Sequence, residues 1–115
     1  MAKVKEIKMY IPQGTTYEHT FNYQQSDGTP IDLTGYSARM QFRETVEATD
    51  TLYDVTNVSG ELVCGNGFVK LTIDDADSTA FTFDKCVGDL EIESPGGIVT
   101  RLVNITAYLD LEVTR

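Results

Sequence analysis

The sequence predicts an all-β protein built as an antiparallel sandwich or barrel, and two observations lead to this fold class. Apolar and polar side chains alternate with a period of two in several segments, as in strands with one buried face and one face in water. Turn signals that contain glycine, among them Asp27-Gly28, Ser59-Gly60 and Pro95-Gly96-Gly97, separate these segments at short intervals. Short strands separated in this way are typical of sandwiches and barrels.

The expected strands follow one another along the chain. A first strand ends before Gln13-Gly14, and later segments at 17–23, 37–43 and 69–73 each carry one apolar face. The apolar faces consist of Tyr17, His19, Phe21 and Tyr23; of Ala38, Met40 and Phe42; and of Val69, Leu71 and Ile73.

The last strand is expected to be irregular. From Val99 to Val113 the apolar residues hold one parity, and only Arg101 interrupts it. Because this run is too long for one ordinary strand, we expect a bulge or bend near Asn104. Residues 44–51 show the weakest pattern and are expected to form an exposed loop or strand edge.

The segment DGTPIDLTG, residues 27–35, has the polar residues of a binding loop, but we interpret it as a corner of the fold. Gly28 can take the positive φ of a turn, and Pro30 keeps the chain extended afterwards. Ile31 and Leu33 share a parity and can pack under the end of the core. Asp32 can accept hydrogen bonds from neighbouring backbone N–H groups.

One segment, 74–81, lacks the strand pattern and is predicted to form a short helical turn. It begins with Asp74, Asp75 and Asp77, and aspartate can accept backbone N–H bonds at a helix start and offset the helix dipole. Ala80 or Phe81 is expected to close the end of the core. The alternative, a calcium loop of the EF-hand type, lacks the required glycine and bidentate glutamate.

Length and charge restrict the function. The length of 115 residues predicts one domain over residues 1–115. The formal net charge of −9 would repel nucleic acid and anionic membranes, so neither is an expected partner. The basic N-terminal residues are not followed by the apolar run of a signal peptide, and no segment has the length of a transmembrane helix.

Candidate catalytic groups are few. The single histidine, His19, lies on the apolar face of an expected strand, and a histidine-rich zinc site is impossible. Cys64 and Cys86 are expected to be reduced thiols, although a disulfide between them stays open. No nucleophile–base pair or phosphate-binding loop is visible, so we expect a protein that is not an enzyme and needs no cofactor or metal.

Tyrosines are the residues that suggest a binding surface. Tyr17, Tyr23 and Tyr36 are expected in the core, whereas Tyr108 lies on the polar parity of the last strand beside Asp110 and Glu112. Aromatic side chains can anchor protein interfaces. Tyr108 and Tyr53 are therefore the candidate protein-interface residues.

Four ordered blocks of the sequence resemble a known group of proteins. The blocks are QGTTYEHTFNY, DGTPIDLTGYSARMQFR, GFVKLTIDDADSTAF and VGDLEIESPGGIVTRLVNITAYLDLEVTR, which together extend from Gln13 to Arg115. This arrangement resembles small virion proteins of tailed bacteriophages, which are similar to the immunoglobulin-like N-terminal domain of phage baseplate upper proteins. Two departures are Gly88, where an aromatic residue normally precedes Asp89, and Asn104, which replaces a glycine.

The resemblance implies an immunoglobulin-like β-sandwich and a structural role in the virion, with no catalytic residues. We expect assembly or attachment in the tail, baseplate or fibre region, or decoration of the capsid, by contacts with other virion proteins and in several symmetric copies. The protein would be made in the bacterial host cytoplasm. The alternative is a carbohydrate- or receptor-binding module on the virion surface that uses loops at one end of the sandwich.

Overall fold

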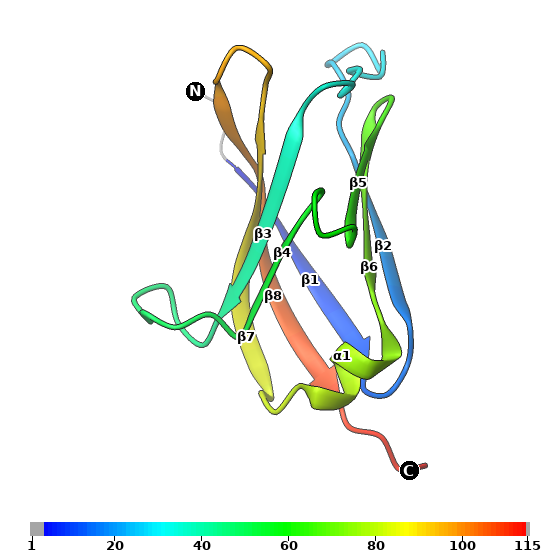
Figure 1. The fold of residues 1–115 in the computed structure, drawn as a ribbon, viewed down its shortest axis with the longest axis vertical. Coiled ribbons are helices and arrows are strands. Elements are labelled where there is room, and N and C mark those ends of the chain that lie inside the picture. The colour runs from blue at the N-terminus through cyan, green and yellow to red at the C-terminus, as the bar shows by residue number, and fades with distance from the viewer. Residues whose placement is uncertain (1–3, 115) are drawn as a thin grey trace.

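The computed structural model describes residues 4–114, which fold into two packed β-sheets (Figure 1). A large sheet of five strands has the order β1-β8-β7-β3-β4, and a small sheet of three strands has the order β2-β6-β5. The elements are β1 (Lys5–Pro12), β2 (Tyr17–Asn22), β3 (Ser37–Arg43), β4 (Tyr53–Thr56), β5 (Leu62–Gly65), β6 (Phe68–Ile73), α1 (Asp75–Ala80), β7 (Lys85–Glu93) and β8 (Val99–Asp110).

The architecture is an all-β immunoglobulin-like sandwich, as the sequence and its resemblance predicted. In the immunoglobulin fold one sheet contains strands C, F and G, and the other contains B, E and D. Here β3, β7 and β8 correspond to the first set, and β2, β6 and β5 correspond to the second. Strand β1 departs from an antiparallel sandwich, since it pairs with β8 in parallel.

The core lies between the two sheets and is formed by the predicted apolar faces. Val55, Met40, Leu90 and Val103 form one row across the large sheet and are all buried. Val69, Leu71 and Ile73 of β6 face them from the small sheet. Phe21 is also buried, while Tyr17, His19, Tyr23 and Tyr36 are half-buried at the margins of the core.

Strand β8 contains the expected irregularity, with a consequence for its faces. Leu90 pairs with Val103 but Glu91 pairs with Arg101, so Leu102 is the extra residue of a bulge, two positions before Asn104. A bulge of one residue reverses which face each parity occupies. Arg101 therefore points outward without interrupting the core. Val99, expected on the apolar face, is 57% exposed.

The buried face of β8 also ends earlier than predicted. Leu111 and Val113 continue the apolar parity, but both are exposed. The reason is that the neighbouring strands end here, because β1 stops at Pro12 opposite Asp110 and β7 begins at Lys85 opposite Tyr108.

The corner at 27–35 is confirmed as a structural feature. Gly28 has a φ of 90°, and Leu33 is fully buried. The Oδ1 atom of Asp32 accepts a hydrogen bond from the Thr34 N–H at 3.0 Å, and Asp27 does the same for Thr29 at 2.9 Å. These local bonds hold the pKa of each carboxyl below its ordinary value.

The predicted helical turn forms as α1, and Phe81 closes the end of the core as expected. One detail of the prediction is wrong, because the Asp74 side chain makes no capping hydrogen bond. The negative charge that favours a helix start comes from Asp75 and Asp77 in the first turn.

Candidate functional site

The candidate site is the solvent-exposed side of the large sheet, which we call the outer face. Alternation along each strand buries one set of side chains and projects the other set outward. The outward set on the four longest strands includes Glu6, Lys8 and Tyr10; Arg39, Gln41 and Arg43; Lys85, Val87, Asp89 and Glu91; and Arg101, Asn104, Thr106 and Tyr108.

The outer face collects the positive charge of an otherwise acidic protein. In the part of the chain from 4 to 114, its basic residues are Lys8, Arg39, Arg43, Lys85 and Arg101, and only Lys5 and Lys70 lie elsewhere. Acidic residues of neighbouring strands lie between them. The outer face is therefore mixed in charge, while the remaining surface is strongly negative.

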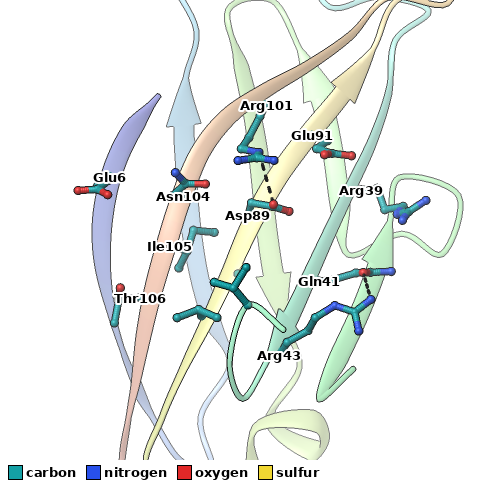
Figure 2. Close-up of a pocket in the computed structure, with 13 residues that line it drawn as sticks. Glu6, Arg39, Gln41, Arg43, Asp89, Glu91, Arg101, Asn104, Ile105 and Thr106 are labelled. Carbon is teal, nitrogen blue, oxygen red and sulfur yellow. Dashed lines mark hydrogen bonds and ion pairs between the residues drawn. The ribbon is translucent and has the colours of Figure 1, made fainter. Parts of the chain in front are cut away.

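A shallow hollow of about 460 Å³ lies on this face (Figure 2). Its floor is formed by β3, β7 and β8, and Val46 of the loop between β3 and β4 contributes to its wall. Arg43 fixes this loop, since its guanidinium donates hydrogen bonds to the carbonyl oxygens of Ala48 at 3.0 Å and Thr49 at 2.8 Å. It also donates to the Gln41 side chain at 3.0 Å.

Several charged groups on the outer face have no partner within the described chain. Arg101 pairs with Asp89 at 3.5 Å, but both side chains are largely exposed, and such pairs contribute little to stability. Arg39, Glu91, Glu6 and Lys8 have no side-chain hydrogen bond or ion pair in residues 4–114. These groups can therefore pair with a bound molecule without losing an internal bond.

Two tyrosines form an aromatic pair on the outer face, near the C-terminal ends of β1 and β8. Tyr10 and Tyr108 lie opposite each other on β1 and β8, and their rings stack with centroids 5.1 Å apart. Tyr10 is 61% exposed. The Lys85 ammonium lies 6.0 Å from the centre of the Tyr108 ring. A partly exposed tyrosine pair next to a cation has the composition of a protein-interface anchor.

The two predicted interface residues do not lie together. Tyr108 is on the outer face as expected, whereas Tyr53 is half-buried and packs against Phe42 and Phe81. The Tyr53 hydroxyl donates a hydrogen bond to Asp77 at 3.1 Å. Burial and the Asp77 carboxylate raise the pKa of this hydroxyl. An interface role for Tyr53 stays a prediction.

Sequence reasoning did not select Tyr10, although a signal for it was present. Ile7, Met9 and Ile11 alternate with Glu6, Lys8 and Tyr10 in the first strand, which places Tyr10 on the polar parity, as for Tyr108. The missing information was the pairing of β1 with β8, which connects residues about 100 positions apart in the chain.

The groups considered for catalysis or metal binding have structural surroundings. The His19 ring lies 4.5 Å from that of Phe21, and burial, with a smaller effect of Lys5, lowers the pKa of this histidine. Cys64 and Cys86 are free thiols. Across residues 4–114, no three His, Cys, Asp or Glu residues are placed to hold a metal ion. No helix in that range is long and apolar enough to cross a membrane.

The fold and this face define an immunoglobulin-like domain with an uncovered, charged sheet face. No model of a known protein family matches the chain, and no curated protein matches it. One similar solved structure comes from photo-crosslinking work on the cell-adhesive interactions of voltage-gated sodium channel β subunits. It is 10% identical, covers 99% of this chain and 98% of its own, and has a TM-score of 0.44.

A second similar structure is the extracellular domain of the sodium channel β4 subunit, described as a parallel homodimer. It is 10% identical, covers 100% of this chain and 92% of its own, and has a TM-score of 0.38. At these values neither likeness bears on partners or function.

Proposed function

We propose that this protein is a non-enzymatic structural protein of a tailed-bacteriophage virion that attaches to other virion proteins through its outer face. The four sequence blocks that resemble phage virion proteins support the virion role. A position in the tail, baseplate or fibre region is preferred over decoration of the capsid, because the resembling domain attaches fibre or receptor-binding proteins.

The observation that carries attachment is the uncovered outer face with its stacked Tyr10–Tyr108 pair. Tyrosine and arginine are the residues that most often anchor interfaces, and here they share one surface with the unpaired groups of Arg39 and Glu91. An interface of this kind needs no reaction and no cofactor. The net negative charge of the remaining surface would limit non-specific association of many copies before assembly.

Co-sedimentation tests the proposal. Purified protein is added to particles of the phage that encodes it, assembled without this chain, and we expect it to co-sediment in a saturable manner. A variant with Tyr10→Ala and Tyr108→Ala should bind at least about tenfold more weakly, because truncating an anchor residue costs about 2 kcal/mol or more. Lys70→Glu on the small sheet is the matched control and should bind like the wild type.

The result that overturns the proposal is the absence of binding to particles together with robust glycan binding. Glycan binding would identify the alternative, a carbohydrate- or receptor-binding module. If particles bind the protein, gold-labelled antibody on intact virions distinguishes a tail position from a head position.

A further inference from the structure

Strand β1 forms an edge of the large sheet, and among residues 4–114 it is paired with another strand on one side only. Its partner is β8, and it is the first strand in the sheet order. In Figure 2 it runs along the margin of the sheet, with the labelled Glu6 side chain beside it. At eight residues it is a long edge strand, and edges of this kind are sites where another strand can be added.

The backbone groups that point away from β8 can be assigned. The N–H of Gln13 donates to the Asp110 carbonyl at 2.8 Å, so residue 13 faces β8. Because strand residues alternate in direction, odd-numbered residues of β1 also face β8, and Glu6, Lys8 and Tyr10 face away. Pro12 agrees with this assignment, since proline in an edge strand is found where its missing N–H would face solvent.

The side chains at this edge carry a self-complementary charge pattern. Glu6 and Lys8 lie on either side of Ile7, both are exposed, and neither has an ion pair within residues 4–114. Ile7 points to the core side and is only half-buried, so part of its apolar surface is open at the edge.

We propose that two copies of this chain pair through β1, antiparallel and across a two-fold axis at Ile7. In this register Glu6 of each copy lies opposite Lys8 of the second copy, so two ion pairs form. Residues 6 and 8 both direct their N–H and C=O groups outward, so each opposite pair exchanges two backbone hydrogen bonds. Ile7 lies opposite Ile7 of the second copy.

Neighbouring registers are disfavoured by charge. A two-fold axis at Glu6 would place glutamate against glutamate, and one at Lys8 would place lysine against lysine. Like charges directly opposite each other on paired strands are destabilising. The order Glu6-Ile7-Lys8 therefore selects one register.

The pairing joins two large sheets into one continuous sheet and places two outer faces side by side. If the proposed virion role is correct, the pair would attach through both faces and gain avidity. The pairing itself is tested on purified protein without particles, so a failure of either proposal leaves the other unaffected.

Sedimentation with charge variants tests the register. An edge contact is smaller than a standard interface, so we expect wild-type dimers to appear between about 10 µM and about 1 mM. Glu6→Lys and Lys8→Glu should each weaken dimerisation at least about tenfold, because each creates two like-charge contacts. An equimolar mixture of the two variants should dimerise again, since both ion pairs are restored between the different chains.

The double variant Glu6→Lys with Lys8→Glu should also dimerise, whereas Lys70→Glu on the small sheet should not differ from the wild type. A wild-type protein that stays monomeric up to about 1 mM overturns the proposal. A mixture of the single variants that fails to associate also overturns it.

Cross-linking gives a second, independent measurement. Residues opposite each other without hydrogen bonds have Cα atoms about 4.5 Å apart, which is within the range for a disulfide. Ile7→Cys, made in a Cys64→Ser background, should form a covalent dimer on mild oxidation. Val63→Cys at the edge of the small sheet is the control and should stay monomeric. Equal cross-linking at both positions would contradict the proposed pairing.

Discussion

Gly88 of β7 is tightly packed against β3. It lies opposite Phe42 and faces the core. A Cβ atom here would lie 2.5 Å from Phe42 Cδ1 and 2.6 Å from the Gln41 carbonyl oxygen. The ring of Phe42, on the neighbouring strand, occupies the space beside Gly88.

We expect Gly88→Ala to lower the free energy of unfolding by about 1–3 kcal/mol, because an added methyl group overpacks a filled core. Urea denaturation followed by circular dichroism measures the change. Gly96→Ala is the control, since its nearest neighbour would be Ser94 Oγ at 3.8 Å, and its effect should stay within about 0.5 kcal/mol. Equal stability of the two variants would show that Phe42 moves aside without cost.

The two cysteines lie on different sheets, Cys64 on β5 and Cys86 on β7. Burial raises the pKa of the Cys86 thiol to about 12 and also raises that of Cys64. The reactive thiolate is therefore scarce at pH 8 in the folded protein.

Iodoacetamide at pH 8 should modify Cys86 very slowly in the folded protein. Both cysteines should react rapidly after unfolding in urea without reductant, and mass spectrometry of the intact chain counts the modified thiols. A thiol that stays unmodified after unfolding would indicate oxidation and contradict the free-thiol assignment.

The residues of the candidate site could be predicted from the sequence in part. Tyr108 was selected correctly as outward-facing because polar residues flank it at its own parity. Tyr53 shares its parity with the buried Val55 of β4, and its environment depends on Phe81 and Asp77, which are distant in sequence. Local alternation identifies a face of a strand, but it does not identify what covers that face.

Among the elements, α1 is held in place by one buried polar residue. Ser78 is fully buried, and its hydroxyl accepts a hydrogen bond from the Gly14 N–H at 3.0 Å and donates to the Thr15 carbonyl at 2.8 Å. These bonds attach the helical turn to the turn between β1 and β2, a connection that joins the two sheets at one end (Figure 1).

Ser78→Ala should lower the free energy of unfolding by about 1–3 kcal/mol, because it leaves the partly buried Gly14 N–H without a partner. Thermal unfolding provides the measurement. Thr79→Ala is the matched control, since the Thr79 hydroxyl bonds only within α1 and is exposed. We expect a change of no more than about 0.5 kcal/mol for the control. A Ser78→Ala variant as stable as the control would show that water replaces the hydroxyl.

The bulge in β8 shows how far an element can be predicted. Its approximate position followed from the length of the apolar run, because ordinary strands are shorter. The outward orientation of Arg101 and Val99 could not be predicted, because it depends on which residue of β8 has no partner on β7. The register of a strand is a property of the pair and not of either strand alone.

At the scale of the whole molecule, both sheets contribute to one continuous core. Each of the eight strands contributes buried residues to the same cluster, from Met9 on β1 to Ala107 on β8, and half-buried residues pack around its margins. A single core of this kind predicts one cooperative unfolding transition. Tyrosine fluorescence and far-ultraviolet circular dichroism should therefore give the same midpoint in urea. Two separated midpoints would mean that the sheets unfold independently.

The net charge of −9 and the charged outer face also belong to this scale. The total charge is visible in the composition and argues against nucleic acid as a partner. Its distribution is not visible, because Lys8, Arg39, Lys85 and Arg101 come from four strands that meet only in the folded sheet.

The sequence by itself determined the all-β class, the corner at 27–35, the helical turn at 74–81 and most of the core, because these depend on local alternation and turn chemistry. The tertiary structure decided the parallel pairing of β1 with β8, and with it the Tyr10–Tyr108 pair, the charged outer face and the free edge at Glu6-Ile7-Lys8. The physical reason is that strand pairing joins residues far apart in the chain, and alternation within one strand carries no information about its neighbour.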